Sequence, residues 1–153
     1  MSAQWIEDRY LDGVEEMLAD ARSRLDRLSP RDAYKEVLWA DALLVDIRPE
    51  AQRAQEGEVH ESLRPLVVER NVLEWRFDPS SSARLPEAAY DARVIVLCQE
   101  GYTSSLAADA LQRLGISRAT DVIGGFQAWQ AANLPVACRR LTAEPMPHPR
   151  LPA

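Results

Sequence analysis

Apolar and polar residues repeat with a helical period in the first part of the chain. Between residues 5 and 25, apolar side chains recur at spacings of three and four, with acids and arginines between them. The apolar positions are Ile6, Tyr10, Val14, Met17, Leu18, Ala21 and Leu25. We therefore predict an amphipathic N-terminal helix within residues 1–24 that packs on the core or on a second copy of the chain. We assign this helix no chemical role.

Short apolar runs and helical segments alternate through the rest of the chain. Ser29 followed by Pro30 predicts a helix start, because serine caps free amides and proline tolerates the first helical position. Apolar runs of strand length lie at residues 42–47, 66–68, 94–97 and 121–123. Helical composition is found up to residue 39 and at residues 104–114 and 126–132. This alternation indicates an α/β domain with a mainly parallel sheet and helices on both of its faces.

Length and composition fit one folded domain. The chain has 153 residues, 46% of them hydrophobic, which is enough for a sizeable core. We expect three parts: the helix within residues 1–24, a domain over residues 25–137, and a proline-rich tail over residues 138–153. The tail lacks apolar periodicity and is expected to be extended.

The net charge and the cysteine content limit the classes of partner and the cellular compartment that we expect. The formal net charge is -6 and the cations are scattered, so nucleic acid is not an expected partner. We see no secretory signal and no membrane span, and therefore expect no membrane partner and a cytoplasmic location. In that reducing compartment Cys98 and Cys138 are expected to be free thiols.

Cys98 lies directly after the most hydrophobic predicted strand and directly before a predicted helix. Ligands bind at this carboxyl edge of parallel sheets. A helix that begins near Ser104 would present free amides and the positive end of its dipole, which favours a thiolate over a thiol. Gly101 would let the loop wrap back so that its amides converge above the sulfur. The alternative is that Cys98 is only a small buried side chain.

These features resemble the rhodanese family of sulfurtransferases over residues 25–136. The resemblance rests on four features: Asp46-Ile47-Arg48 at the end of an early strand, the six-residue loop 98–103, the small-residue helix 105–111, and the segment from Asp121 through Gly124-Gly125 and Trp129 to Leu134-Pro135-Val136. It implies a central parallel sheet of five strands, a catalytic Cys98, and a ping-pong cycle through a persulfide on that cysteine. It implies no metal and no organic cofactor.

The same resemblance suggests substrates and site residues. Cys98 would take the outer sulfur of thiosulfate or a persulfide donor and pass it to cyanide, a thiol or a protein acceptor. The loop residues expected to bind substrate are Gln99, Glu100, Gly101, Tyr102, Thr103 and Ser104. Asp46 and Arg48 are expected to support the site, and they also fit a structural ion pair. The chain is expected to be a monomer or a homodimer.

The loop also departs from well-known sulfurtransferase loops. It carries Gln99, Glu100 and Thr103 where basic residues are often found, so dianionic thiosulfate is expected to be a poor donor and a neutral or protein-bound persulfide a better one. The segment 58–65 lacks the His-x-x-Gly-Ala-like signature of the family. The second hypothesis is therefore a non-catalytic module of this family that binds a partner or senses oxidants.

A phosphatase or arsenate reductase is disfavoured by the loop. Family members with a loop one residue longer handle phosphate or arsenate, and phosphatases need an arginine that closes the loop, a residue missing at positions 103–105.

Outside the loop, His60 has no partner at metal-ligand spacing, so no metal site is expected. Cys138 is either a resolving thiol or incidental, and Arg70 and Glu74 are weak candidates for the pocket border.

Overall fold

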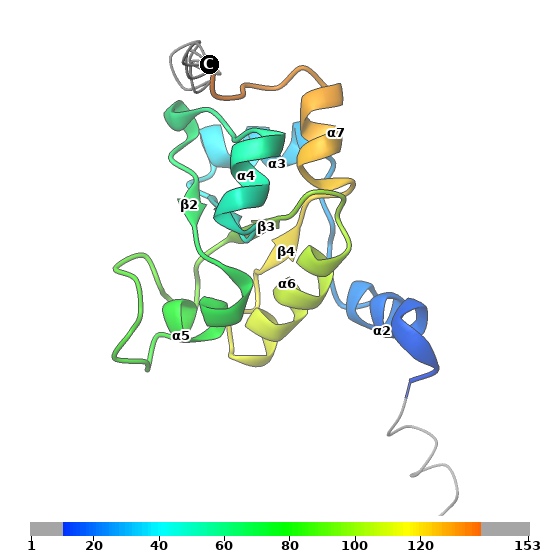
Figure 1. Cartoon of the computed structure of the whole chain (residues 1–153). Helices are drawn as coiled ribbons and strands as arrows, with labels where there is room; N and C mark the ends of the chain where they lie inside the picture. The colour runs from blue at the N-terminus through cyan, green and yellow to red at the C-terminus, as the bar shows by residue number, and fades with distance from the viewer. Residues whose placement is uncertain (1–10, 139–153) are drawn as a thin grey trace, which may run out of the picture.

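A parallel four-stranded sheet forms the centre of the molecule (Figure 1). The structure is a computed structural model and describes residues 11–138. The strand order is β2-β1-β3-β4. The strands are β1 (Leu43–Asp46), β2 (Leu66–Val67), β3 (Val94–Leu97) and β4 (Thr120–Asp121). The α/β fold with a parallel sheet is confirmed. β3 coincides with its apolar run, β1 and β2 are shorter than theirs by two and one residues, and β4 begins one residue before its run and ends at Asp121.

Helices connect the strands and cover both faces of the sheet. The α-helices are α2 (Gly13–Arg22), α3 (Pro30–Trp39), α4 (Glu50–Glu56), α5 (Leu73–Phe77), α6 (Thr103–Arg113) and α7 (Gly125–Ala131). Two 3-10 turns, η1 (Glu61–Leu63) and η2 (Arg70–Val72), flank β2. The oxygen of Ser29 accepts a hydrogen bond from the amide of Asp32 at 3.1 Å, so the predicted cap of α3 is confirmed.

Side chains of β3 alternate between two apolar cores, as a strand buried on both faces requires. Val94 and Val96 join one core with α5 and α6, whereas Ile95 and Leu97 join the other with α3 and α7. Cys98 continues this alternation on the α5 and α6 side. Because Asp46 pairs with Leu97, the ends of β1 and β3 bring residues 47–48 and Cys98 to the same edge of the sheet.

The expected fifth strand is reduced to one bridge. Leu28 pairs with Val122 beside β4, through hydrogen bonds from Leu28 N to Asp121 O at 3.1 Å and from Ile123 N to Leu28 O at 2.8 Å. The pairing stops there because Ser29 and Pro30 begin α3 at once, and proline has no amide to donate. The five-stranded sheet is therefore corrected to four strands within residues 11–138.

The predicted N-terminal helix can be followed only in part. Residues 1–10 lie outside the described residues, as does the tail from residue 139; within the described residues α2 begins at Gly13, whose φ is 82°. Leu18 and Ala21 are buried and α2 lies against α6 (Figure 1), but Val14 and Met17 remain exposed. Within residues 11–138, no helix has the length and apolar character needed to cross a bilayer.

Candidate active site

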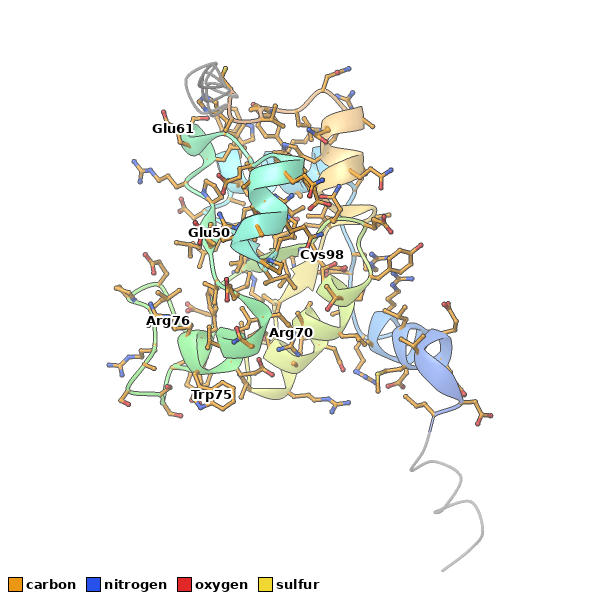
Figure 2. All side chains as sticks on the ribbon, in the orientation of Figure 1. Glu50, Glu61, Arg70, Trp75, Arg76 and Cys98 are labelled. Carbon is orange, nitrogen blue, oxygen red and sulfur yellow. The ribbon has the colours of Figure 1, made fainter. Side chains whose placement is uncertain are left out.

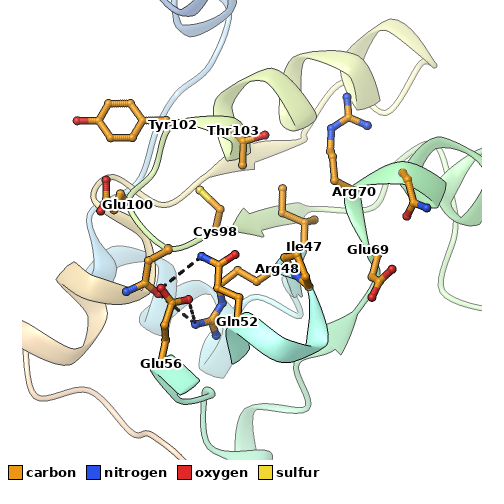
Figure 3. A pocket seen from close by; sticks show the side chains of 13 residues that line it. Ile47, Arg48, Gln52, Glu56, Glu69, Arg70, Cys98, Glu100, Tyr102 and Thr103 are labelled. Carbon is orange, nitrogen blue, oxygen red and sulfur yellow. Dashed lines mark hydrogen bonds and ion pairs between the residues drawn. The ribbon is translucent and has the colours of Figure 1, made fainter. Parts of the chain in front are cut away.

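Cys98 lies at the bottom of a pocket at the carboxyl edge of the sheet, between α4 and α6 (Figure 2). The pocket has a volume of about 580 Å³, and the thiol at its base leaves Cys98 only 4% exposed. Figure 3 shows the sulfur with Gln52 of α4 on one side and Thr103 of α6 on the other. The amide of Gly101 donates a hydrogen bond to Sγ at 3.2 Å. The loop thus folds back over its own cysteine.

Three carbonyl groups of the loop, those of Cys98, Gln99 and Gly101, are bound by donors from other parts of the chain. The amides of Phe126 and Gln127, in the first turn of α7, donate to the carbonyl oxygens of Cys98 at 2.8 Å and Gln99 at 3.0 Å. The Gly101 carbonyl accepts from two arginines. In a trans peptide the next amide points opposite to the carbonyl, so the amides of residues 99, 100 and 102 face the other way.

Those amides are available to a ligand. Within residues 11–138, the backbone amides of residues 99, 100, 102, 103 and 104 engage no acceptor. They include the first amides of α6, the end of a helix where donors are unpaired and the dipole is positive. The arrangement is able to stabilise an anionic sulfur at this point, by the same physics as an oxyanion hole.

Two glycines permit this close packing. Gly101 has a φ of 85°, and a Cβ there would lie 2.7 Å from the amide nitrogen of Gly124. Gly125 has a φ of 60°, and a Cβ there would overlap the Cys98 carbonyl oxygen. The loop and the Gly124-Gly125 turn therefore touch through backbone atoms alone.

Arg48 fixes the neighbouring strand end to the loop. Its side chain is 1% exposed and forms two hydrogen bonds with the Asp46 carboxylate, at 3.0 and 2.7 Å. It also donates to the side-chain oxygen of Gln99 at 3.2 Å and to the Gly57 carbonyl at 2.8 Å, and it lies 4.3 Å from the centre of the Phe126 ring. Asp46 and Arg48 thus form a buried ion pair that supports the loop from below.

One protein-family model matches most of this chain. The family model of the rhodanese-like domain matches residues 29–132, more than half of the chain. The chain belongs to the rhodanese-like domain family.

Relatives of this rhodanese-like domain include sulfurtransferases. The chain is 30% identical over 112 residues to the thiosulfate sulfurtransferase GlpE of Glaesserella parasuis, covering 71% of this chain and 90% of that protein. It is 36% identical over 87 residues to the adenylyltransferase and sulfurtransferase MOCS3-2 of Zea mays. That match covers 57% of this chain but only 17% of the maize protein, so the chain is far shorter than that relative.

A solved structure from Rhodopseudomonas palustris has a similar fold. It superposes with a TM-score of 0.74 at 28% identity, and the match covers 84% of this chain and 96% of that one. It is described as a protein of unknown function and a possible tyrosine phosphatase. In this rhodanese-like domain the loop ends at Thr103 and is followed by Ser104 and Ser105, so the arginine that phosphoryl oxygens require is missing at these positions.

The structure brings most of the predicted site residues to the pocket, in different ways. Gln99, Glu100, Tyr102 and Thr103 line it, although the Tyr102 ring points away from the sulfur (Figure 3). Gly101 contributes its amide. Ser104 does not face the pocket: it is fully buried, and its hydroxyl donates to Asp121 at 2.7 Å. Only its backbone amide remains for the role that the resemblance implies.

Carboxylates surround the pocket of this rhodanese-like domain. Glu56, Glu69 and Glu100 line it, whereas the two arginines on its wall are already paired. Arg48 is paired with Asp46, and Arg70 is paired with Glu74 at 2.6 Å on the side of the pocket away from Glu100 (Figure 3). The pocket therefore has little free positive charge to attract a dianion.

Three supporting residues were missed by the sequence analysis. Arg22 and Arg27 bind the Gly101 carbonyl, and Asp121 binds Arg27. Arg22 and Arg27 lie 74 or more positions before Gly101 in the chain, so no local motif relates them to the loop.

The other candidates lie elsewhere. Cys138 is an exposed free thiol at a different pocket, which it shares with His60. The His60 ring contacts the Ser62 hydroxyl at 2.8 Å, and no metal-binding group of side chains occurs within residues 11–138. Glu74 pairs with Arg70 and is not among the residues that line the Cys98 pocket.

Proposed function

We propose that this chain is a sulfurtransferase that carries one sulfur atom as a persulfide on Cys98. The observation that carries the proposal is the amide of Gly101 on Sγ, together with the unengaged amides around it. A persulfide places its extra electron density on a terminal sulfur, which such donors stabilise. The sulfurtransferase relatives favour the same reaction.

The cycle has two balanced steps. In the first, the Cys98 thiolate attacks the outer sulfur of a persulfide donor; a new S–S bond forms, the donor S–S bond breaks, and the donor leaves as a thiolate. In the second, an acceptor thiolate attacks the terminal sulfur of the Cys98 persulfide, which gives an acceptor persulfide and restores the Cys98 thiolate. With thiosulfate and cyanide the leaving group is sulfite and the product thiocyanate.

Pocket charge and size favour a persulfide over thiosulfate as the donor. Glu56, Glu69 and Glu100 oppose a dianion, and a volume of about 580 Å³ has room for an organic thiol or an exposed cysteine of another protein. Both described cysteines are free thiols, which fits a reducing compartment such as the cytoplasm.

Replacement of the nucleophile tests the proposal. Wild-type protein incubated with an alkyl persulfide, and separately with thiosulfate, should gain one sulfur atom by intact mass, and Cys98→Ser should gain none. Cys138→Ser is the matched control, because it removes the other described thiol and should still load.

Two results would decide against the enzyme. Sulfur that still appears on Cys98→Ser would show that another group carries it. If neither donor ever loads wild-type protein, the alternative, a binding or redox-sensing module, is favoured by the carboxylates around the pocket.

A further inference from the structure

One backbone oxygen of the Cys98 loop is bound by two arginines from outside the family match. The Gly101 carbonyl accepts a hydrogen bond from Arg22 Nη2 at 2.8 Å and from Arg27 Nη2 at 2.9 Å. Both arginines precede residue 29, where the match to the family model begins. Arg22 is the last residue of α2, and Arg27 lies in the segment that follows. This segment therefore reaches the back of the loop.

Arg27 is anchored by a buried carboxylate. Asp121 is fully buried and accepts from Arg27 Nε at 2.9 Å and Nη2 at 3.1 Å. The same carboxylate accepts from the hydroxyls of Ser104 and Ser105, in the first turn of α6, at 2.7 and 2.8 Å. Arg27 is thus neutralised, and it ties the loop to β4 and to the start of α6.

Arg22 differs because its charge is not neutralised by a carboxylate. Its Nε donates to the Ser105 hydroxyl at 3.0 Å, and its guanidinium lies 5.8 Å from the centre of the Tyr102 ring. No ion pair within residues 11–138 includes it. Arg22 is partly buried, so solvent screens this charge less than that of an exposed arginine.

The two arginines hold the loop through the carbonyl group of Gly101. They fix the Gly101 carbonyl, so the next amide, that of Tyr102, points the opposite way. Charged donors on a carbonyl also polarise its peptide group, which strengthens the opposite amide as a donor. The loop has no basic side chain of its own, since Gln99, Glu100 and Thr103 occupy those positions.

We propose that Arg22 and Arg27 are positioning residues of the Cys98 loop, and that the unpaired charge of Arg22 stabilises the anionic sulfur from behind the loop. The positive charge that related loops carry in front of the cysteine is supplied here by the N-terminal segment. The consequence for sulfur transfer rests on the proposed function, whereas the effect on the thiolate does not.

Other charged groups line the pocket around Cys98, and they are the same in all the variants compared below. Arg48 and Glu56 lie on the β1 and α4 side, Glu69 and Arg70 on the η2 side, and Glu100 on the loop itself. Because none of them touches Arg22, a change at Arg22 isolates its contribution.

The test measures the alkylation rate of Cys98 by iodoacetamide against pH, in a Cys138→Ser background. For Arg22→Gln the profile should move to higher pH, and the rate at pH 7 should fall about three- to ten-fold, because less of the thiol is ionised. Arg22→Lys keeps the charge and should recover most of the rate. Arg31→Gln is the matched control: it removes one arginine charge just after the same segment, but Arg31 donates to the Ala132 carbonyl and does not contact the loop, so its profile should match wild type.

If Arg22→Gln is folded by circular dichroism and its profile superimposes on wild type, the proposal is wrong. If Arg22→Gln does not fold, the comparison moves to Arg22→Lys and Arg27→Lys, and unchanged profiles in both also overturn it. Sulfur loading is measured separately by mass, so an altered alkylation profile in a protein that never loads sulfur rejects the proposed function and leaves this inference standing.

Discussion

Backbone contacts with α7 hold one side of the Cys98 loop. The carbonyl groups of Cys98 and Gln99 are bound by amides of α7, and the amide of Gly101 is bound to Sγ. Gly125 lies directly against the Cys98 carbonyl oxygen, in a conformation with positive φ. There is no space for even one added carbon at this position.

Gly125→Ala should therefore damage the site more than a glycine change elsewhere. Left-handed backbone alone costs a non-glycine residue about 1–2 kcal/mol, and the overlap with the Cys98 carbonyl adds to this. Gly13→Ala is the control, because Gly13 also has positive φ but has open space around its Cβ position. Urea unfolding should show a larger loss for Gly125→Ala, and only that variant should lose Cys98 alkylation at pH 7. Equal losses in the two variants would contradict the argument.

Single residues also show where the sequence was informative. Cys98 and Gly101 could be predicted because a cysteine between an apolar strand and a helix, with a glycine after it, is a local pattern. Ser104 was expected to bind substrate, but its hydroxyl points to Asp121, which is 17 positions later. The direction of a hydroxyl depends on a partner that the sequence does not reveal.

Among the elements, α2 departs most from its expected role. Its apolar stripe predicted a packing helix, and Leu18 and Ala21 are indeed buried. Its position also depends on polar contacts: Arg24 binds Asp20 on the same helix at 2.8 Å and Asp109 of α6 at 2.7 Å. These contacts place the end of α2, and with it Arg22, behind the loop.

The contact between Asp20 and Arg24 gives a pH-dependent prediction. The hydrogen bond that Asp20 accepts from Arg24 holds the pKa of the Asp20 carboxyl below its ordinary value of 3.8. A lowered folded-state pKa means that the contact stabilises the fold above pH 3.8 and stops doing so as the pH falls through the folded-state pKa. Asp20→Asn should lower the thermal midpoint slightly at pH 6, because the pair is exposed and weak, and by less at pH 2.5.

Glu15→Gln provides the control for that measurement. Glu15 lies on the same exposed helix and is in none of the ion pairs of residues 11–138, so its replacement should give no such difference. A deficit of Asp20→Asn that persists unchanged at pH 2.5 would mean that the carboxylate charge is not the cause.

The order of elements was predictable, whereas the sheet edge was not. Four apolar runs identified four strands, because buried parallel strands are continuous in hydrophobicity. The fifth strand was expected only from the family resemblance, and Ser29-Pro30 begins α3 before Leu28 can extend its single bridge. The same cap that predicted α3 therefore also limits the sheet.

For the whole molecule, the proposed function predicts that net charge affects which sulfur donors approach. The formal net charge of -6 and the carboxylates around the pocket act together against anions. Such repulsion reaches about 30 Å at 0.01 M salt and about 10 Å at 0.1 M salt. Under the proposed function, we therefore expect the most highly charged donors to be repelled before they reach Cys98.

Loading of Cys98 by thiosulfate should accordingly rise with salt. We expect the second-order rate to increase about two- to ten-fold between 10 and 200 mM potassium chloride, because screening removes repulsion of the dianion. An alkyl persulfide, with at most one charge, should respond less. Glu100→Gln should flatten the thiosulfate response. A thiosulfate rate that falls with added salt would mean that the approach is attractive.

The hydrogen bonds that Arg22 and Arg27 form with the distant Gly101 carbonyl could not be predicted from the sequence. Composition and spacing predicted one α/β domain and the position of Cys98 at the carboxyl edge of its sheet. They did not predict that Arg22 and Arg27 meet at one carbonyl, because that meeting depends on how α2 packs against α6 and on the ion pair between Arg27 and Asp121.

The hydrogen bonds between the cysteine loop and α7 have a consequence for protein engineering. Six residues grafted from this chain onto another parallel sheet would bring carbonyl groups whose partners, the amides of Phe126 and Gln127, were left behind. A successful transplant would need the diglycine turn and the first turn of the last helix as well. The smallest portable unit of these backbone contacts is two segments, separated by twenty residues of chain.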